Sequence, residues 1–495
     1  MTSPHTSVAG LAQDRSDDAQ LAALGYTPTF ARDMSLWENF SLGFTYLSPV
    51  VGVYSIFALA LAAGGPPMIF WLLIVGAGQF LVALVFAELV SQYPLAGGVY
   101  PWARRLWGRK WAWLTGWIYG WALLATIAAV SFGAGPFVAD LLGIAQGSTV
   151  NILTAIGIIL GVTWVNLRGT ALLGRVAMFG FVCEILGALV LGLWLLVFDR
   201  AQPWSVIFDT QGLGHGVDGY LPAFLAAALI GLYQYYGFEA CGDVAEEVAD
   251  PGRRIPRAMR YTLYVGGAAA TFICYALLLA VVDIPAVMSG ADTDPIGHVL
   301  RTTFGPIGSR CLLGVVLVSF FSCALSLQAA ASRLIYAYAR DGIIAGSATL
   351  ARVPAGRQMA PAALGLAAVL PVGVVLLEII APGGLVMFAS FAALGIYVAF
   401  QMVVLAALRA RIKGWRASGP YTLGRAGFIV NALALLFGVS AIVLLAQPGT
   451  SADAGLLQNW IVLIGVGVVV GTGLLYLALA GPHRRGHSPA GDALG

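Results

Sequence analysis

One stretch of the chain combines an apolar helix with residues that could bind a ligand. Residues 224–256 read FLAAALIGLYQYYGFEACGDVAEEVADPGRRIP and place Gly231 and Gly237 shortly before the acid Glu239. Glycine makes a helical hydrogen-bond ladder easy to open. Opened backbone at membrane depth survives only where protein or a water-filled cavity satisfies its polar groups. The pattern therefore predicts a broken membrane helix that lines a binding site.

A second apolar stretch, residues 44–55, is interrupted in a similar way and reads FTYLSPVVGVYS. Pro49 cannot donate a backbone hydrogen bond, and Gly52 has no side chain to favour a helix. We therefore expect the helix to break between Ser48 and Tyr54. A proline kink without function is the alternative, because Pro and Gly are common in membrane helices.

The breaks predict the chemistry of a ligand. Where a helix resumes after a break, unpaired N–H groups and the positive end of the helix dipole suit a carboxylate. Carbonyls left free at the same breaks suit an ammonium group or a metal ion, so a zwitterion such as an amino acid satisfies both. Packing is the alternative role for the aromatic residues. The expected substrate-binding residues are Ser48, Val51, Gly52, Val53, Tyr54, Tyr233, Tyr236, Gly237 and Phe238.

The composition indicates a polytopic membrane protein. Of the 495 residues, 59% are hydrophobic and 10% are charged, and the mean hydropathy is +0.87. Such a chain is too apolar for a soluble globular protein. The net charge of +3 gives no indication of a nucleic-acid partner. The first 35 residues contain no signal-peptide pattern and are expected to form a loosely ordered cytoplasmic tail.

Apolar runs of about 20 residues predict twelve membrane-spanning helices. The predicted helices are 36–63, 68–93, 111–142, 149–167, 172–198, 221–245, 259–282, 307–338, 360–380, 383–408, 426–446 and 457–480. With a cytoplasmic N-terminus, only three of the 26 basic residues, Arg200, Arg301 and Arg310, fall outside, as the positive-inside rule requires. We expect both termini in the cytoplasm and the chain in the plasma membrane.

The interrupted stretches belong to the first and sixth predicted helices. The two helices are five spans apart. Because an odd number of spans separates them, a repeat that begins at the sixth helix enters the membrane from the opposite face. Corresponding breaks then indicate an inverted repeat with a substrate site between its halves. The expected parts are a tail 1–35, a first five-helix repeat 36–199, a second repeat 221–408, two further helices within 426–480 and a cytoplasmic tail 481–495.

Three motifs in order resemble the amino acid/polyamine/organocation superfamily of secondary transporters. Residues 88–108, ELVSQYPLAGGVYPWARRLWG, are similar to its E-x(5)-P-x-x-G-G-x-Y signature. Residues 236–259 resemble its G-[FV]-E segment with an acidic cap and basic residues, and 331–342, ASRLIYAYARDG, resemble a third motif. The resemblance, strongest to the amino acid, γ-aminobutyrate and choline branch, implies an all-α, leucine-transporter-like fold. That fold has two inverted five-helix repeats plus two peripheral helices, and the resemblance places a gating aromatic at Tyr233.

Glu184, in the middle of the fifth predicted helix, is the main candidate coupling residue. Proton-coupled members of the superfamily often read N-x-[KR]-G near the start of this helix and carry a lysine eighteen residues after the Asn. This chain has Asn166 and Gly169 in that motif and Glu184 at the lysine's place. A buried carboxylate at this depth costs several kcal/mol unless compensated. We expect Glu184 to take up a proton, neighbour a sodium ion or neutralise a cationic substrate group; a structural acid bonded to carbonyls of the first helix is the alternative.

Other polar residues are expected to support coupling or gating. Glu239 is expected either to cap opened backbone or to act in transport. Ser319 and Ser322 share a helix face with Ser326, where sodium-coupled relatives place an ion site; close helix packing is the alternative. Three further acids near the inner face are expected to make gate or loop contacts with the arginines that neighbour them: Glu88, Glu246 and Glu247.

These observations predict a secondary active transporter and no enzyme. The sequence has no GxSxG, HExxH or Walker motif, and no cofactor or metal is expected. The expected substrates are amino acids, γ-aminobutyrate, choline or polyamines, carried across a lipid bilayer by alternating access. We expect a proton gradient, a sodium gradient or exchange to drive transport. A transport-inactive sensor with the same fold and a passive channel are the alternatives.

Overall fold

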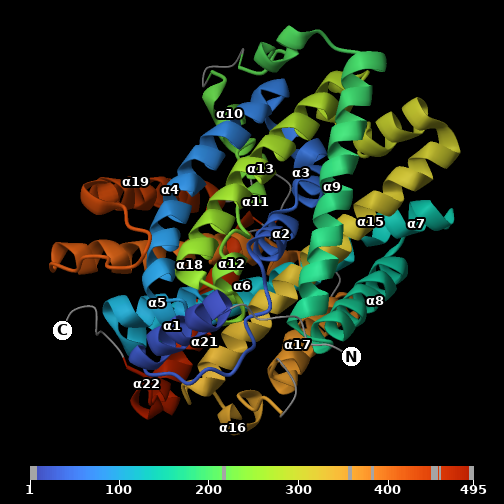
Figure 1. The fold of residues 1–495 in the computed structure, drawn as a ribbon. Coiled ribbons are helices and arrows are strands. Elements are labelled where there is room, and N and C mark those ends of the chain that lie inside the picture. The colour runs from blue at the N-terminus through green and yellow to red at the C-terminus, as the bar shows by residue number, and fades with distance from the viewer. Residues whose placement is uncertain are drawn as a thin grey trace.

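The chain folds into a bundle of packed helices (Figure 1). The computed structural model describes residues 8–214, 219–354, 359–380, 384–447, 455 and 459–489. Among these residues, eleven helical stretches are long and apolar enough to cross a membrane. Length and composition therefore indicate a multi-pass membrane protein.

The described helices follow one another in this order. The first half contains α1 (Val8–Ala23), α2 (Leu36–Leu47), α3 (Pro49–Gly64), α4 (Phe70–Gln92), α5 (Val99–Trp107), α6 (Arg109–Gly133), α7 (Gly135–Leu142), α8 (Ser148–Leu167) and α9 (Thr170–Phe198). The second half contains α10 (Leu221–Ala226), α11 (Leu229–Gln234), α12 (Ala240–Asp243), α13 (Pro251–Ala280), α14 (Ile284–Met288), α15 (Pro295–Arg340), α16 (Ser347–Leu350), α17 (Pro361–Ile380) and α18 (Gly384–Ile412). The last helices are α19 (Gly427–Leu445), α21 (Ile461–Ala480) and α22 (Pro482–Arg485).

Most predicted apolar helices lie within a few residues of observed ones, and the exceptions have local causes. The predicted helix 221–245 is divided into α10, α11 and α12, which follow one another down the centre of Figure 1. α13 begins at Pro251, eight residues before its predicted start, because its first turns are basic and polar although helical. α15 begins at Pro295 rather than 307, and it kinks where Gly305 has a φ of +63°.

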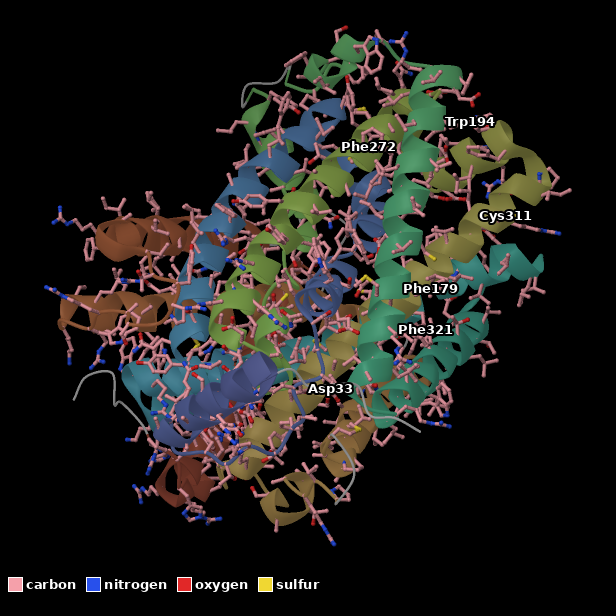
Figure 2. The ribbon with its side chains drawn as sticks, in the orientation of Figure 1. Asp33, Phe179, Trp194, Phe272, Cys311 and Phe321 are labelled. Atoms are coloured by element: carbon pink, nitrogen blue, oxygen red, sulfur yellow. The ribbon has the colours of Figure 1, made fainter. Side chains whose placement is uncertain are left out.

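α9 has one exposed apolar face and one buried face. Phe179 and Trp194 lie on its outer face (Figure 2), where they are 60% and 43% exposed. Its buried residues recur every three or four positions, as expected for one face of a helix, and they include Gly180 and Glu184. A Cβ at Gly180 would lie 2.5 Å from Cβ of Ser322, so the glycine permits close contact with α15. The apolar face suits lipid, and the opposite face carries a buried acid toward the bundle.

Buried ion pairs join the helices at one end of the bundle, which we call the basic end after Arg104, Arg333, Arg340 and Arg411. Glu247 accepts from Arg333 at 2.7 Å, and Glu246 accepts from Arg340 at 2.8 Å. Glu88 pairs with Arg411. The three acids do contact arginines, but the partners come from the distant helices α15 and α18 and not from the neighbouring arginines that the sequence suggested.

The described part of the N-terminal tail, residues 8–35, is ordered, so the expected loose tail was wrong for this segment. Leu21 is 3% exposed, and the Tyr26 hydroxyl donates to Asp341 at 2.9 Å. Burial raises the pKa of Tyr26, so its hydroxyl remains protonated and able to donate. The Met34 N–H donates to the carbonyl of Glu247 at 3.0 Å. This order was hard to predict from the sequence because α1 has almost no apolar periodicity.

Replacing Arg333 with Gln tests how much a buried ion pair at the basic end stabilises the protein. The substitution leaves Glu247 buried without its cation, and such a loss costs about 3–5 kcal/mol. We expect the thermal midpoint of the detergent-solubilised protein, measured by size-exclusion chromatography after heating, to fall by several degrees. Arg301→Gln is the control, because Arg301 is 50% exposed and pairs with Asp294 near the surface. Equal midpoints for both variants would contradict this assignment.

Candidate functional site

The first helix break consists of one residue, Ser48, between α2 and α3. Its φ of +38° and ψ of 94° are not helical. Pro49 begins α3, a position that proline tolerates because it needs no N–H donor there. Residues 49–54 are therefore helical, which corrects the part of the prediction that placed unwound backbone along Pro49–Tyr54. The break falls at the first residue of the predicted range.

The N-terminus of α3 is occupied by the carboxylate of Glu184. The Val50 N–H donates to Oε1 of Glu184 at 2.8 Å, and the Ser48 hydroxyl donates to the same oxygen at 2.7 Å. The Val51 N–H donates to Oγ of Ser48 at 3.2 Å. Because Pro49 has no N–H and Gly52 donates to the Ser48 carbonyl at 3.0 Å, the donors of this first turn are satisfied.

Two sequence expectations are corrected by these bonds. The N–H groups where the helix resumes were expected to be unpaired, yet a carboxylate from α9 already accepts from one of them. The structural alternative for Glu184 assigned it to carbonyls of the first helix, whereas it accepts from an N–H and a hydroxyl. Its second oxygen, Oε2, is buried without a hydrogen-bond partner among the described residues.

The carbonyls before the break are satisfied by side chains that the sequence prediction missed. Nε2 of Gln234, in α11, donates to the Leu47 carbonyl at 3.1 Å. Sγ of Cys323, in α15, donates to the Tyr46 carbonyl at 3.3 Å. A Cβ at Gly52 would lie 2.2 Å from Oε1 of Gln234, so only glycine leaves room for this amide. The sequence did contain one sign of this role, because Gln234 is a single amide side chain next to a predicted break.

The second break joins α11 to α12 through residues 235–239, which are not helical. Gly237 has a φ of +115°, and a Cβ there would lie 2.6 Å from the backbone nitrogen of Leu47. Glycine is therefore required by both conformation and space. The Gly237 N–H donates to Oε2 of Glu239 at 2.7 Å, so Glu239 caps the opened backbone.

A cavity of about 300 Å³ lies between the two breaks. Its lining residues are Tyr46, Leu47, Val51, Gly52, Ser55, Ile56, Thr126, Ala129, Val130, Gly133, Tyr233, Tyr236, Phe320, Cys323 and Ala392. This volume is at the lower end of small-molecule sites. None of the described residues that line it is charged, and its polar groups are hydroxyls, one thiol and backbone. Such a wall suits a small ligand whose charges are met by opened backbone.

The cavity brings together some of the predicted substrate-binding residues. Its lining includes Val51, Gly52, Tyr233 and Tyr236 and does not include Ser48, Val53, Tyr54, Gly237 or Phe238. Tyr54 instead packs against Phe137, with ring centroids 6.5 Å apart. Phe238 packs between Phe86 and Phe400 at 5.9 and 5.6 Å. These two aromatic side chains support the helices around the breaks.

The serines of α15 donate hydrogen bonds mainly within their own helix. Ser319 Oγ donates to the Val315 carbonyl at 3.1 Å, and Ser322 Oγ donates to the Ser319 carbonyl at 3.2 Å. Ser326 Oγ lies 2.8 Å from Oγ1 of Thr45 on α2. The close approach of Gly180 to Ser322 supports the packing alternative, and an ion site at Ser319 and Ser322 stays a prediction.

Comparisons with known proteins agree on the kind of molecule. A family model described as amino acid permease matches residues 34–471. The chain is 27% identical over 466 residues to the amino-acid permease BAT1 of Arabidopsis thaliana, covering 88% of this chain and 89% of that protein. It is 27% identical over 356 residues to the branched-chain amino acid permease BcaP of Lactococcus lactis, covering 67% and 74%. A manganese transporter mutant of Eremococcus coleocola has a similar fold, with a TM-score of 0.58, 13% identity, and coverage of 91% and 94%.

A double substitution tests the contact between the breaks. Gly52→Ala places a Cβ against the Gln234 amide, and overpacking of this kind costs about 1–3 kcal/mol. Gln234→Ala leaves the Leu47 carbonyl without its donor, at a cost of about 1–3 kcal/mol. We expect the double variant to be less destabilised than the sum of the two single variants, because the second change removes the clash. Strictly additive losses of thermal stability would contradict the contact.

Proposed function

The chain belongs to the amino acid permease family, and on this premise we propose that it carries its substrate through the cavity between the two helix breaks. It is a secondary transporter of amino acids, not an enzyme. The observation that carries the proposal is that one cavity reaches both breaks. Leu47 and Val51 border it beside Ser48, and Tyr236 borders it at the second break. Sites of secondary transporters lie at such breaks near the midplane.

We propose that α10, α11 and α12 together form the sixth of twelve spans. Residues 36–199 and 221–408 then form two inverted five-helix repeats, with α19 and α21 outside them. The equivalent positions of the breaks support this arrangement, as does the transporter-like fold. A difference in burial also supports it, since the most apolar window within Phe391–Ile412 is 83% buried and that of α21 is 17% buried.

We propose that the basic end faces the cytoplasm across the plasma membrane, with both termini on that side. The distribution of basic residues favours this orientation. The described parts of both terminal tails lie at the basic end: Arg105 donates to the Leu24 carbonyl, and Arg109 donates to the Ser488 carbonyl at 2.9 Å. One orientation therefore accounts for both tails.

The proposed substrate is a small amino acid or γ-aminobutyrate. Its ammonium group would be held by carbonyls at the C-terminal end of α11, which lose their helical donors where the chain opens at Tyr235. Tyr233 and Tyr236 border the same space. Its carboxylate would bind the N-terminus of α3 beside Gly52. Choline and polyamines lack the carboxylate that this helix end favours, so we rank them below amino acids.

We propose that Glu184 couples transport to protons by competing with the substrate carboxylate. Both carboxylates suit the Val50 N–H, and Glu184 holds it at 2.8 Å. Protonation of Glu184 removes its charge and weakens its bond to the helix N-terminus. A neutral Glu184 would then yield the position to a substrate. This mechanism predicts that substrate affinity rises as the pH falls, whereas a sodium-coupled site would respond mainly to sodium.

Glu184→Gln tests this coupling. The amide oxygen can still accept from Val50 and Ser48, so the fold should be retained. We expect gradient-driven accumulation in proteoliposomes to be lost, while exchange of labelled for unlabelled amino acid continues and no longer depends on pH. Asp199→Asn is the matched control, because Asp199 follows the last residue of α9 and is partly exposed. Accumulation with the wild-type pH dependence in the Gln variant would show that Glu184 is structural.

Tyr233→Ala tests the cavity as the substrate site. Loss of an aromatic wall should weaken apparent substrate affinity by about 1–3 kcal/mol, which corresponds to roughly fivefold to 150-fold. The measurement is counterflow with a panel of amino acids, γ-aminobutyrate, choline and polyamines. Tyr264→Ala, which removes a tyrosine that is 54% exposed, is the control. Saturable counterflow also separates a carrier from a sensor, which exchanges nothing, and from a channel, which leaks without saturation.

A further inference from the structure

Two buried acids flank a single tyrosine hydroxyl next to the second break. The hydroxyl of Tyr119, on α6, lies 3.2 Å from Oε1 of Glu239 and 3.0 Å from Oδ2 of Asp243. All three side chains are fully buried. Neither Tyr119 nor Asp243 was selected from the sequence, and neither lines the cavity. The mechanism proposed above uses none of these contacts.

The number of hydrogens in this cluster limits its charge. A phenol has one O–H donor, and an ionised carboxylate only accepts. If both acids were ionised, Tyr119 could donate to one of them, and its other contact would place oxygen lone pairs against each other. Two buried like charges without a cation are also costly. One added proton resolves the conflict: the protonated acid donates to Tyr119, and Tyr119 donates to the other carboxylate.

Among the residues that the structure describes, no basic side chain pairs with either acid to supply the missing charge. None of the ion pairs among the described residues includes Glu239 or Asp243. The titratable groups that face the pair from neighbouring segments are neutral donors: Tyr46 of α2, Tyr119 of α6, Tyr236 and Cys241 near the break, and Tyr397 of α18. The Tyr46 hydroxyl is buried beside both acids and faces Glu239 as a further neutral donor.

We propose that Glu239 and Asp243 share one proton and that Tyr119 carries it between them. In the transfer, the proton on Oε1 of Glu239 passes to the Tyr119 oxygen while the hydroxyl proton of Tyr119 passes to Oδ2 of Asp243. Glu239 becomes a carboxylate, Asp243 becomes an acid, and Tyr119 stays neutral. The pair is a second proton site, separate from Glu184.

The position of Asp243 gives the relay a direction. Its carbonyl accepts from the Gly97 N–H at 2.9 Å, immediately before α5. Its Oδ1 is buried without a partner among the described residues, and a Cβ at Gly98 would lie 2.8 Å from it. α5 carries Arg104 at the basic end. Transfer from Glu239 to Asp243 therefore moves a proton from the second break toward that end.

Infrared spectroscopy of the purified protein tests the shared proton without measuring transport. A protonated carboxylic acid has a carbonyl stretch that is distinct from carboxylate bands and shifts in heavy water. We expect the spectrum of Asp243→Asn to lack one acid band that the wild-type spectrum contains. Glu239 remains in this variant, but it no longer needs the shared proton because a neutral amide replaces the second carboxyl group. Glu239→Gln should lose it too, and it serves if Asp243→Asn does not fold. Loss of only carboxylate bands in these variants would overturn the proposal.

The relay role rests on the proposed transport function and is tested by Tyr119→Phe in proteoliposomes. This variant keeps the ring and removes the bridging hydroxyl. We expect substrate-driven proton flux, measured with a pH-sensitive dye, to fall about tenfold or more while exchange stays within about twofold. Tyr397→Phe, which removes a buried hydroxyl bonded to neither acid, is the control and should retain both proton flux and exchange. Unchanged proton flux in Tyr119→Phe would overturn the relay, whereas absent exchange in wild type would instead reject the proposed function.

Discussion

The structure depends on one constraint: backbone opened inside a membrane bundle must find partners within the protein. Both breaks meet this constraint with side chains from distant parts of the chain. Glu184 holds the helix N-terminus after Ser48, and Gln234 holds the carbonyl before it. Glu239 holds the Gly237 N–H at the other break. The breaks are therefore stable only while these helices keep their present positions.

This dependence links the site to movement of the bundle. α9 contributes Glu184 to the first break, and α11 contributes both Gln234 and the wall at Tyr233. A shift of either helix relative to α2 and α3 must replace these bonds by others, such as bonds to a substrate. The glycines at the contacts, Gly52 and Gly180, leave room for close approach but have no side chain that could bond to the neighbouring helix. Binding and movement thus involve the same small set of hydrogen bonds.

Local sequence predicted the breaks because their causes are local. Pro49 lacks a donor, and Gly237 alone permits the conformation and the contact with Leu47. Glu184 was found because an acid in an apolar helix is conspicuous. Its partner Ser48 was not found, because 136 positions separate the two residues in the sequence. Gln234 and Asp243 were missed for the same reason: their roles come from helices that pack against them, and a single sequence does not record those contacts.

Calorimetry tests most directly the claim that Glu184 and the substrate carboxylate compete for the N-terminus of α3. The purified protein is titrated with its best counterflow substrate in buffers that differ in ionisation enthalpy, so that the measured heats give the protons bound per substrate. We expect proton uptake on binding in wild type and none attributable to this site in Glu184→Gln. Binding of the substrate without proton uptake in wild type, or equal uptake in both proteins, would contradict it.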